Sequence, residues 1–149
     1  MKSAYELALE FKRRHPMTIA WRIKQNASIV DKHVNDDEKI LYAFVAQKNN
    51  SPFNIWGSAV IAVTDKRILI GRKRVVIGYF LNSITPDMFN DLKVTSGIIW
   101  GKIYIDTVKE FIALSNISKD ALDEIESAVS SYMMEEKKHY TLNGGGLGR

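Results

Sequence analysis

The sequence predicts a small antiparallel β-barrel or sandwich that is capped by a C-terminal helix and preceded by two N-terminal helices. The chain has 149 residues, of which 46% are hydrophobic, and this suits one domain with a real core. Seven short β-rich runs follow one another at hairpin-length spacing, and amphipathic helical patterns lie before and after them. Because parallel strands need crossovers of a dozen residues or more, such short links favour antiparallel pairing.

The first 35 residues are predicted to form two helices. Residues 3–15 place apolar side chains at the 3–4 spacing of one helix face, and Pro16 ends this helix. The cations in its last turn suit the negative end of the helix dipole. A second helix is predicted over residues 18–33, with Thr18 as its N-cap. Its apolar stripe comprises Ala20, Ile23, Ala27, Val30 and Val34.

The strands are predicted from runs of β-branched and aromatic residues between turn signals. The second and third strands are separated by residues 64–66, where Thr64 and Asp65 can accept backbone N–H bonds. Arg67 enters the third strand and can pair with Asp65 or with an acid on a neighbouring strand. The seven predicted strands cover residues 39–47, 58–63, 67–70, 75–80, 92–96, 98–105 and 110–114.

A third helix is predicted to begin after Ser118, which would act as its N-cap. Acids in its opening turns complement the positive end of the helix dipole. The glycine-rich residues 141–149 have nothing to bury, so we expect them to be mobile. The expected organisation is a helical extension over residues 1–35, a β-domain over residues 36–136 and a flexible tail over residues 137–149.

The charge is mildly basic and unevenly spread. Lysine and arginine number 21 against 17 acids, a net charge of +4. Residues 1–24 and 66–86 are basic, whereas residues 118–136 hold six acids and one lysine. The sequence contains no cysteine, which excludes a disulfide framework and a thiol nucleophile. No apolar run is long enough to span a bilayer and no signal peptide is evident, so a cytoplasmic protein is expected.

Three segments of the predicted β-domain carry a family resemblance: residues 37–41 (DEKIL), 63–69 (VTDKRIL) and 101–105 (GKIYI). In this order and spacing they resemble the entry to the first strand, the second hairpin and the sixth strand of bacterial pleckstrin-homology (PH)-like domains, specifically the YokE-like PH domain family. The resemblance spans about residues 36–136. It implies seven antiparallel strands closed by one helix, and a binding module rather than an enzyme.

No pattern of an enzyme, metal site or cofactor site accompanies this fold. The histidines His15, His33 and His139 lack metal-site spacing, and we expect them at the surface or at helix ends. The acidic run of residues 35–38 lacks the alternating ligands and the glycine of a calcium loop. We therefore predict no catalytic residue, no cofactor and no metal. A small-molecule pocket between helix and barrel stays possible, but no residue pattern identifies one.

The candidate contact residues are cations in the second and third hairpins: Lys66, Arg67, Arg72, Lys73 and Arg74. On an anionic membrane surface each would contribute about 1 kcal/mol, which amounts to weak adhesion. Nucleic acid is not expected, because no aromatic residue lies between residues 66 and 74 for stacking.

The first loop, residues 48–56, departs from the lipid-binding members of the resembled family. Phosphoinositide-binding PH domains place several cations in and around this loop, whereas here Lys48 is its one cation. Recognition of inositides is therefore disfavoured. Phe53 and Trp56 in the same loop are candidates for a protein contact or a shallow membrane insertion, with burial under the barrel rim as the alternative.

The first functional interpretation is a non-catalytic binding or scaffold module for a protein partner or for a second copy of the chain. The basic residues 72–74 and the acidic residues 120–136 allow a head-to-tail contact, and other bacterial PH-like domains assemble into rings. An exposed strand edge is another way to bind a protein. The alternative is a peripheral binder of anionic membranes through the same hairpin. A third interpretation is that the charged residues form solvated faces with no specific partner.

Overall fold

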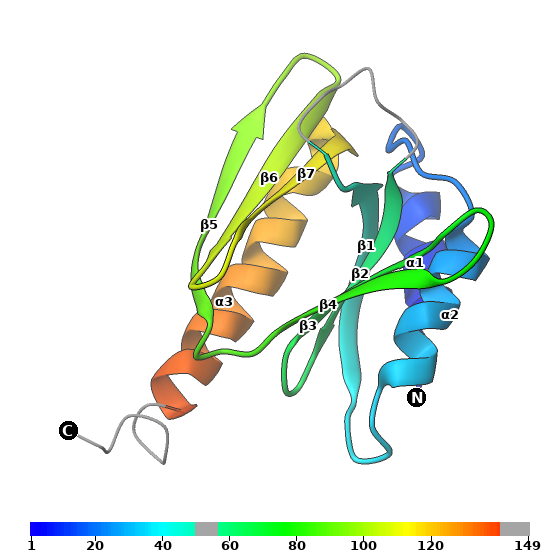
Figure 1. Ribbon diagram of the computed structural model, residues 1–149. Coiled ribbons are helices and arrows are strands. Elements are labelled where there is room, and N and C mark those ends of the chain that lie inside the picture. Colours follow the sequence, from blue (N-terminus) through cyan, green and yellow to red (C-terminus); the bar gives the residue numbers. More distant parts are fainter. Residues whose placement is uncertain (50–56, 141–149) are drawn as a thin grey trace.

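Seven antiparallel strands form one curled sheet in the order β4-β3-β2-β1-β7-β6-β5, which confirms the predicted fold class (Figure 1). The computed structural model describes residues 1–49 and 57–140. Strands β4 and β5 are the two edges of the sheet. The strands are β1 (Ile40–Gln47), β2 (Ser58–Thr64), β3 (Ile68–Lys73), β4 (Tyr79–Ile84), β5 (Phe89–Ser96), β6 (Trp100–Thr107) and β7 (Phe111–Ser118).

The sheet consists of two halves that splay apart around the C-terminal helix. Strand β1 pairs with β7 at Gln47 and Ser115, whereas pairing within each half follows the length of the strands. Helix α3 (Leu122–Tyr140), preceded by the 3-10 turn η1 (Lys119–Ala121), lies between the halves (Figure 1). Its buried side chains complete the barrel interior: Leu122, Ile125, Val129 and Met133.

Two N-terminal helices cover the opposite face of strands β1 to β3. Helix α1 (Ala4–Arg14) packs on β1, and helix α2 (Ile23–His33) packs on β2 and β3 of the same chain (Figure 1). Every residue of β2 is buried, as expected of a strand with protein on both faces. Side chains of both helices, among them Phe11 and Val30, belong to the same hydrophobic core as the strands.

Helix α2 approaches β3 closely because β3 carries a glycine where the two meet. A Cβ atom on Gly71 would lie 2.8 Å from Val30 Cγ2 and 3.1 Å from the carbonyl oxygen of Asn26. Asn26 is itself buried and joins three elements. Its Nδ2 donates to the carbonyl of Ser58 at 3.1 Å, and its Oδ1 accepts the N–H of Lys73 at 2.8 Å. These contacts fix the start of the β3–β4 hairpin against α2.

The β2–β3 turn is held by the side chains that the sequence indicated. Thr64 Oγ1 accepts the N–H of Arg67 at 3.0 Å, and Asp65 Oδ1 accepts the N–H of Lys39 at 3.0 Å. Arg67 pairs with Glu38, just ahead of β1, and its Nε and Nη2 each donate to a carboxylate oxygen at 3.0 Å. Residues 63–69, one of the three segments that carry the family resemblance, therefore stabilise the fold.

The predicted start of the second helix is wrong. Helix α2 begins at Ile23, and Thr18 does not cap it. Thr18 Oγ1 instead accepts the N–H of Ser118 at 2.9 Å, which ties the linker between the helices to the end of β7. Arg22 occupies the N-cap position in the left-handed region, with a φ of 52°.

The predicted fourth strand is also wrong. Strand β3 extends to Lys73 and β4 begins at Tyr79, so of the predicted strand only residues 79 and 80 belong to a strand, and residues 75–78 form the turn. Gly78, with a φ of 88°, closes the turn, and its carbonyl accepts the N–H of Arg74 at 3.0 Å. Such a φ favours glycine, so Gly78 sets where the chain reverses. The β-branched run that resembles a strand therefore supplies the hairpin tip, and the other strand bounds shift by a few residues.

Helix α1 ends against α3 in a cluster of polar and charged side chains. Arg14 Nη2 and the Tyr42 hydroxyl each donate to Glu124 Oε2 at 2.7 Å. His15, a helix-end residue as predicted but a buried one, lies 3.2 Å from Asp120 Oδ1 and 3.0 Å from Glu124 Oε1. Burial by itself raises the pKa of Glu124, but the hydrogen bonds from Arg14, Tyr42 and His15 hold this pKa at about 2.

Gly71→Ala should destabilise the fold, because the added methyl group would overlap Val30 and the backbone of α2. We expect the free energy of unfolding to fall by about 1–3 kcal/mol, measured by urea denaturation. Gly57→Ala is the matched control, since a Cβ there meets its nearest atom, in the flexible side chain of Asn49, at 3.3 Å. Equal losses in the two variants would contradict the close packing of α2 on β3.

Stability should fall in acid as Glu124 becomes protonated. Its pKa drops from an ordinary value of 4.5 to about 2 on folding. The ionised carboxylate therefore contributes its full stabilisation above pH 4.5, and this contribution is lost as the pH falls toward 2. Glu124→Gln should unfold at lower urea concentration near neutral pH and should show a flatter pH dependence across this window. The exposed Glu126→Gln is the control. A wild-type pH dependence in Glu124→Gln would show that this carboxylate is not responsible.

Candidate functional site

The tip of the β3–β4 hairpin exposes three consecutive apolar side chains. Val75, Val76 and Ile77, here called the apolar tip, are 83%, 86% and 80% exposed. Single exposed apolar residues are ordinary, whereas a contiguous apolar group marks a contact surface. Figure 1 shows the hairpin reaching past the sheet alongside α2. The apolar tip is therefore placed where a large surface can approach it.

Three cations, here called the hairpin cations, lead into the apolar tip: Arg72, Lys73 and Arg74. The guanidinium carbons of Arg72 and Arg74 lie 4.9 and 5.4 Å from the centre of the Phe80 ring, so both make cation–π contacts with one side chain. Within residues 1–49 and 57–140, none of the hairpin cations forms an ion pair with an acid. The hairpin thus combines an apolar end with positive charge that these residues leave unneutralised.

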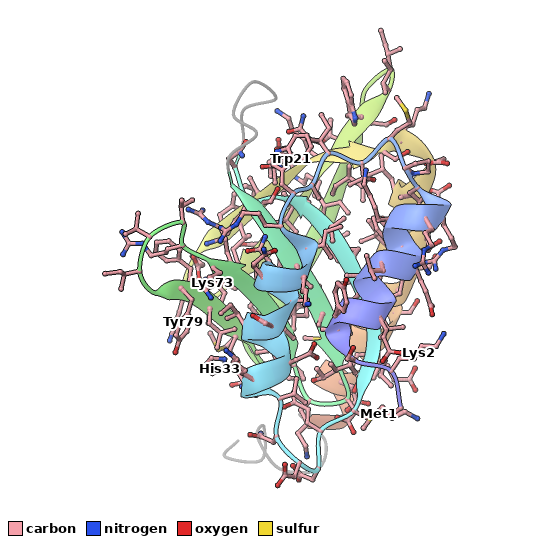
Figure 2. All side chains as sticks on the ribbon, turned by 90° about the vertical axis from the view of Figure 1, so that its right-hand side faces the viewer. Met1, Lys2, Trp21, His33, Lys73 and Tyr79 are labelled. Carbon is pink, nitrogen blue, oxygen red and sulfur yellow. The ribbon has the colours of Figure 1, made fainter. Side chains whose placement is uncertain are left out.

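A pocket of about 390 Å³ opens between the hairpin and the start of α2. Four of its described lining residues are cationic, and no described lining residue is an acid. Trp21 contributes an indole that is 48% exposed. Figure 2 shows Trp21 at the beginning of α2, with Lys73 on the neighbouring hairpin. The lining residues are Trp21, Arg22, Asn26, Ser58, Arg72, Lys73, Arg74 and Val75.

Hydrogen bonds connect the residues that line this pocket, and one of them joins its two walls. Arg22 Nη1 donates to the carbonyl of Lys73 at 2.8 Å. The backbone N–H of Trp21 donates to Ser58 Oγ at 2.8 Å, and the carbonyl of Trp21 accepts Asn26 Nδ2 at 3.3 Å. These hydrogen bonds within the chain fix the lining residues relative to one another.

The structure divides the five predicted contact cations into two groups. The hairpin cations, residues 72–74, lie together beside the pocket. Lys66 and Arg67 lie at the other end of β3, where Lys66 Nζ is 3.4 Å from Asp37 Oδ2 and Arg67 is paired with Glu38. Their charges are already matched within the chain. Phe53 and Trp56 lie outside the described residues, as do residues 141–149.

Sequence reasoning missed the apolar tip and Trp21 as candidate contact residues. A signal for the tip exists, because an isolated glycine inside a strand pattern indicates a bulge or a turn, and Gly78 interrupts the run VVIGYF. Trp21 has no comparable signal. The sequence pattern puts Trp21 within a helix, and its exposure beside the hairpin depends on the tertiary structure.

A second apolar hairpin end lies between β5 and β6. Ile98 is 92% exposed, and the next residues, Ile99 and Trp100, are partly exposed. A shallower pocket of about 320 Å³ lies beside them, and Lys102 is the one cation among its described lining residues. This hairpin shares the apolar character of the β3–β4 hairpin without its cluster of cations, which makes it a natural internal control.

Seven antiparallel strands in a curled half-barrel, closed by a C-terminal helix, define a PH-like domain. The bacterial PH domain family matches residues 34–131, more than half of the chain, so the chain belongs to this family. This confirms the resemblance seen in the sequence, and domains of this family are generally binding modules.

A crystal structure of a pleckstrin homology domain from Shewanella amazonensis SB2B is similar, with 12% sequence identity and a TM-score of 0.49 over 76% of this chain and 90% of that one. No curated protein shows a significant match. Among the described residues, no helix is long and apolar enough to cross a membrane.

Proposed function

We propose that this chain is a non-catalytic PH-like module that binds the anionic surface of a membrane through the β3–β4 hairpin. One observation carries this proposal: the apolar tip and the hairpin cations occupy the same protruding hairpin. Apolar side chains can enter the lipid layer at the depth where cations meet the anionic headgroups.

Neither part of the hairpin is sufficient alone. Three cations near an anionic surface contribute about 3 kcal/mol, which corresponds to millimolar binding. Full burial of a valine or isoleucine contributes about 1.5–3 kcal/mol, and partial burial of the three tip side chains adds about 3–5 kcal/mol. The sum of about 6–8 kcal/mol corresponds to micromolar binding. The apolar tip thus turns the weak adhesion expected from the sequence into reversible attachment.

Flotation with lipid vesicles tests this function. The protein should float with vesicles that contain phosphatidylglycerol and not with neutral phosphatidylcholine vesicles, and salt should weaken flotation by screening the cations. Val76→Ser/Ile77→Ser should weaken binding about tenfold or more, because most of the inserted apolar surface is removed while all charges stay.

Ile98→Ser at the β5–β6 hairpin is the matched control for this experiment, because it removes an equally exposed apolar side chain away from the hairpin cations. It should float like the wild type. No flotation of the wild type with anionic vesicles at low salt would contradict the proposed function. An equal loss in Ile98→Ser would show that the β3–β4 hairpin has no special role.

Self-association is a second candidate, and charge complementarity favours it. Helix α3 keeps Asp123, Glu126 and Glu135 exposed, although Asp120 and Glu124 contact the end of α1 in their own chain. The hairpin cations of one copy on α3 of the next would form a head-to-tail contact. This contact predicts oligomers in native mass spectra at low salt that dissociate at high salt. A monomer under both conditions would exclude it and leave membrane binding in place.

A further inference from the structure

We propose that the pocket between the β3–β4 hairpin and α2 binds the phosphate group of an anionic phospholipid, together with the first carbons of its acyl chains. This inference rests on the proposed function, because it adds a headgroup site to the same hairpin. Its volume, about 390 Å³, falls in the range of about 300–1,000 Å³ that small-molecule pockets occupy.

The electrostatics of the pocket favour an anion. Arg22 and the hairpin cations line it, and its described lining includes no acid. Arg72 and Arg74 lie near each other because both contact the ring of Phe80. Neither of these two positive charges has a counter-ion among the described residues. An anion between them would relieve their repulsion. Phosphate suits this site, because a guanidinium group can donate two parallel hydrogen bonds to its oxygens.

The start of α2 adds to this positive field. Arg22, the N-cap residue, lines the pocket, so the positive end of the helix dipole lies beside it. Within the described chain, no side chain caps this helix end. The φ of 52° at Arg22 is rare for a residue other than glycine, and in this conformation its guanidinium group bonds to the carbonyl of Lys73.

The apolar part of the lining points to a lipid rather than to a free phosphate ester. Trp21 lines the pocket and is half exposed, and indole rings are enriched at the boundary between lipid and water. Val75 belongs both to the pocket and to the apolar tip. A headgroup held by the arginines would therefore continue into acyl chains that lie along the inserted tip.

A short-chain lipid tests the pocket without a membrane. The probe is dihexanoyl-phosphatidylglycerol below its micelle concentration, and the signal is the NMR shift of the Trp21 indole N–H, assigned with Trp21→Phe. Arg72→Gln and Arg74→Gln should each weaken binding about tenfold, since each removes a charge-assisted contact with phosphate. The exposed Lys93→Gln removes an equal charge from a residue outside the pocket lining and should bind like the wild type.

The outcomes separate this inference from the proposed function. Val76→Ser/Ile77→Ser leaves every lining residue in place, so it should keep the affinity for the short-chain lipid while it loses flotation. Absence of a saturable Trp21 shift, or equal affinity in the arginine variants and in Lys93→Gln, would overturn the pocket. Glycerol 3-phosphate supplies the phosphate without acyl chains and should bind at least tenfold more weakly. If it bound as tightly as the lipid, the lipid assignment would be overturned.

Discussion

The contact of α2 with β3 at Gly71 determines where the apolar tip and the hairpin cations lie. Because Gly71 has no Cβ, the helix lies close enough for Asn26 to reach both the Ser58 carbonyl and the Lys73 N–H. The same contact covers one face of β2, which is why that strand is buried along its whole length. A hairpin on its own is marginally stable in water. The apolar tip and the hairpin cations keep a defined position because α2 holds the base of their hairpin.

Cations that look alike in the sequence have different surroundings in the structure. Lys66 and Arg67 lie where the chain brings Asp37 and Glu38 close, so their charges are matched locally. The hairpin cations, residues 72–74, lie where no described acid approaches, and two of them contact an aromatic ring instead. A net charge of +4 therefore understates the local field at the hairpin. Position relative to acids, more than the number of cations, decides which surface can attract an anion.

The parts of the structure that follow from local signals were predictable from the sequence. Strand number, antiparallel pairing and the closing helix follow from hairpin-length spacing and periodicity. The β-branched side chains of residues 75–77 predict a strand, but the left-handed φ at Gly78 reverses the chain there. Ile98 and Ile99 repeat this error before β6. The pocket depends on Arg22 and Lys73, which are 51 residues apart in the sequence, so no local pattern could indicate it.

The pocket includes residues that lie outside the segment matched by the family. The bacterial PH domain family matches residues 34–131, whereas Trp21, Arg22 and Asn26 precede this segment and form one wall of the pocket. The other wall, residues 72–75, belongs to the matched barrel. A barrel without the N-terminal helices would still have the hairpin cations, but neither the indole nor the helix end that faces them. The proposed lipid site is therefore a property of the extension and the barrel together, and membership of the family does not by itself imply it.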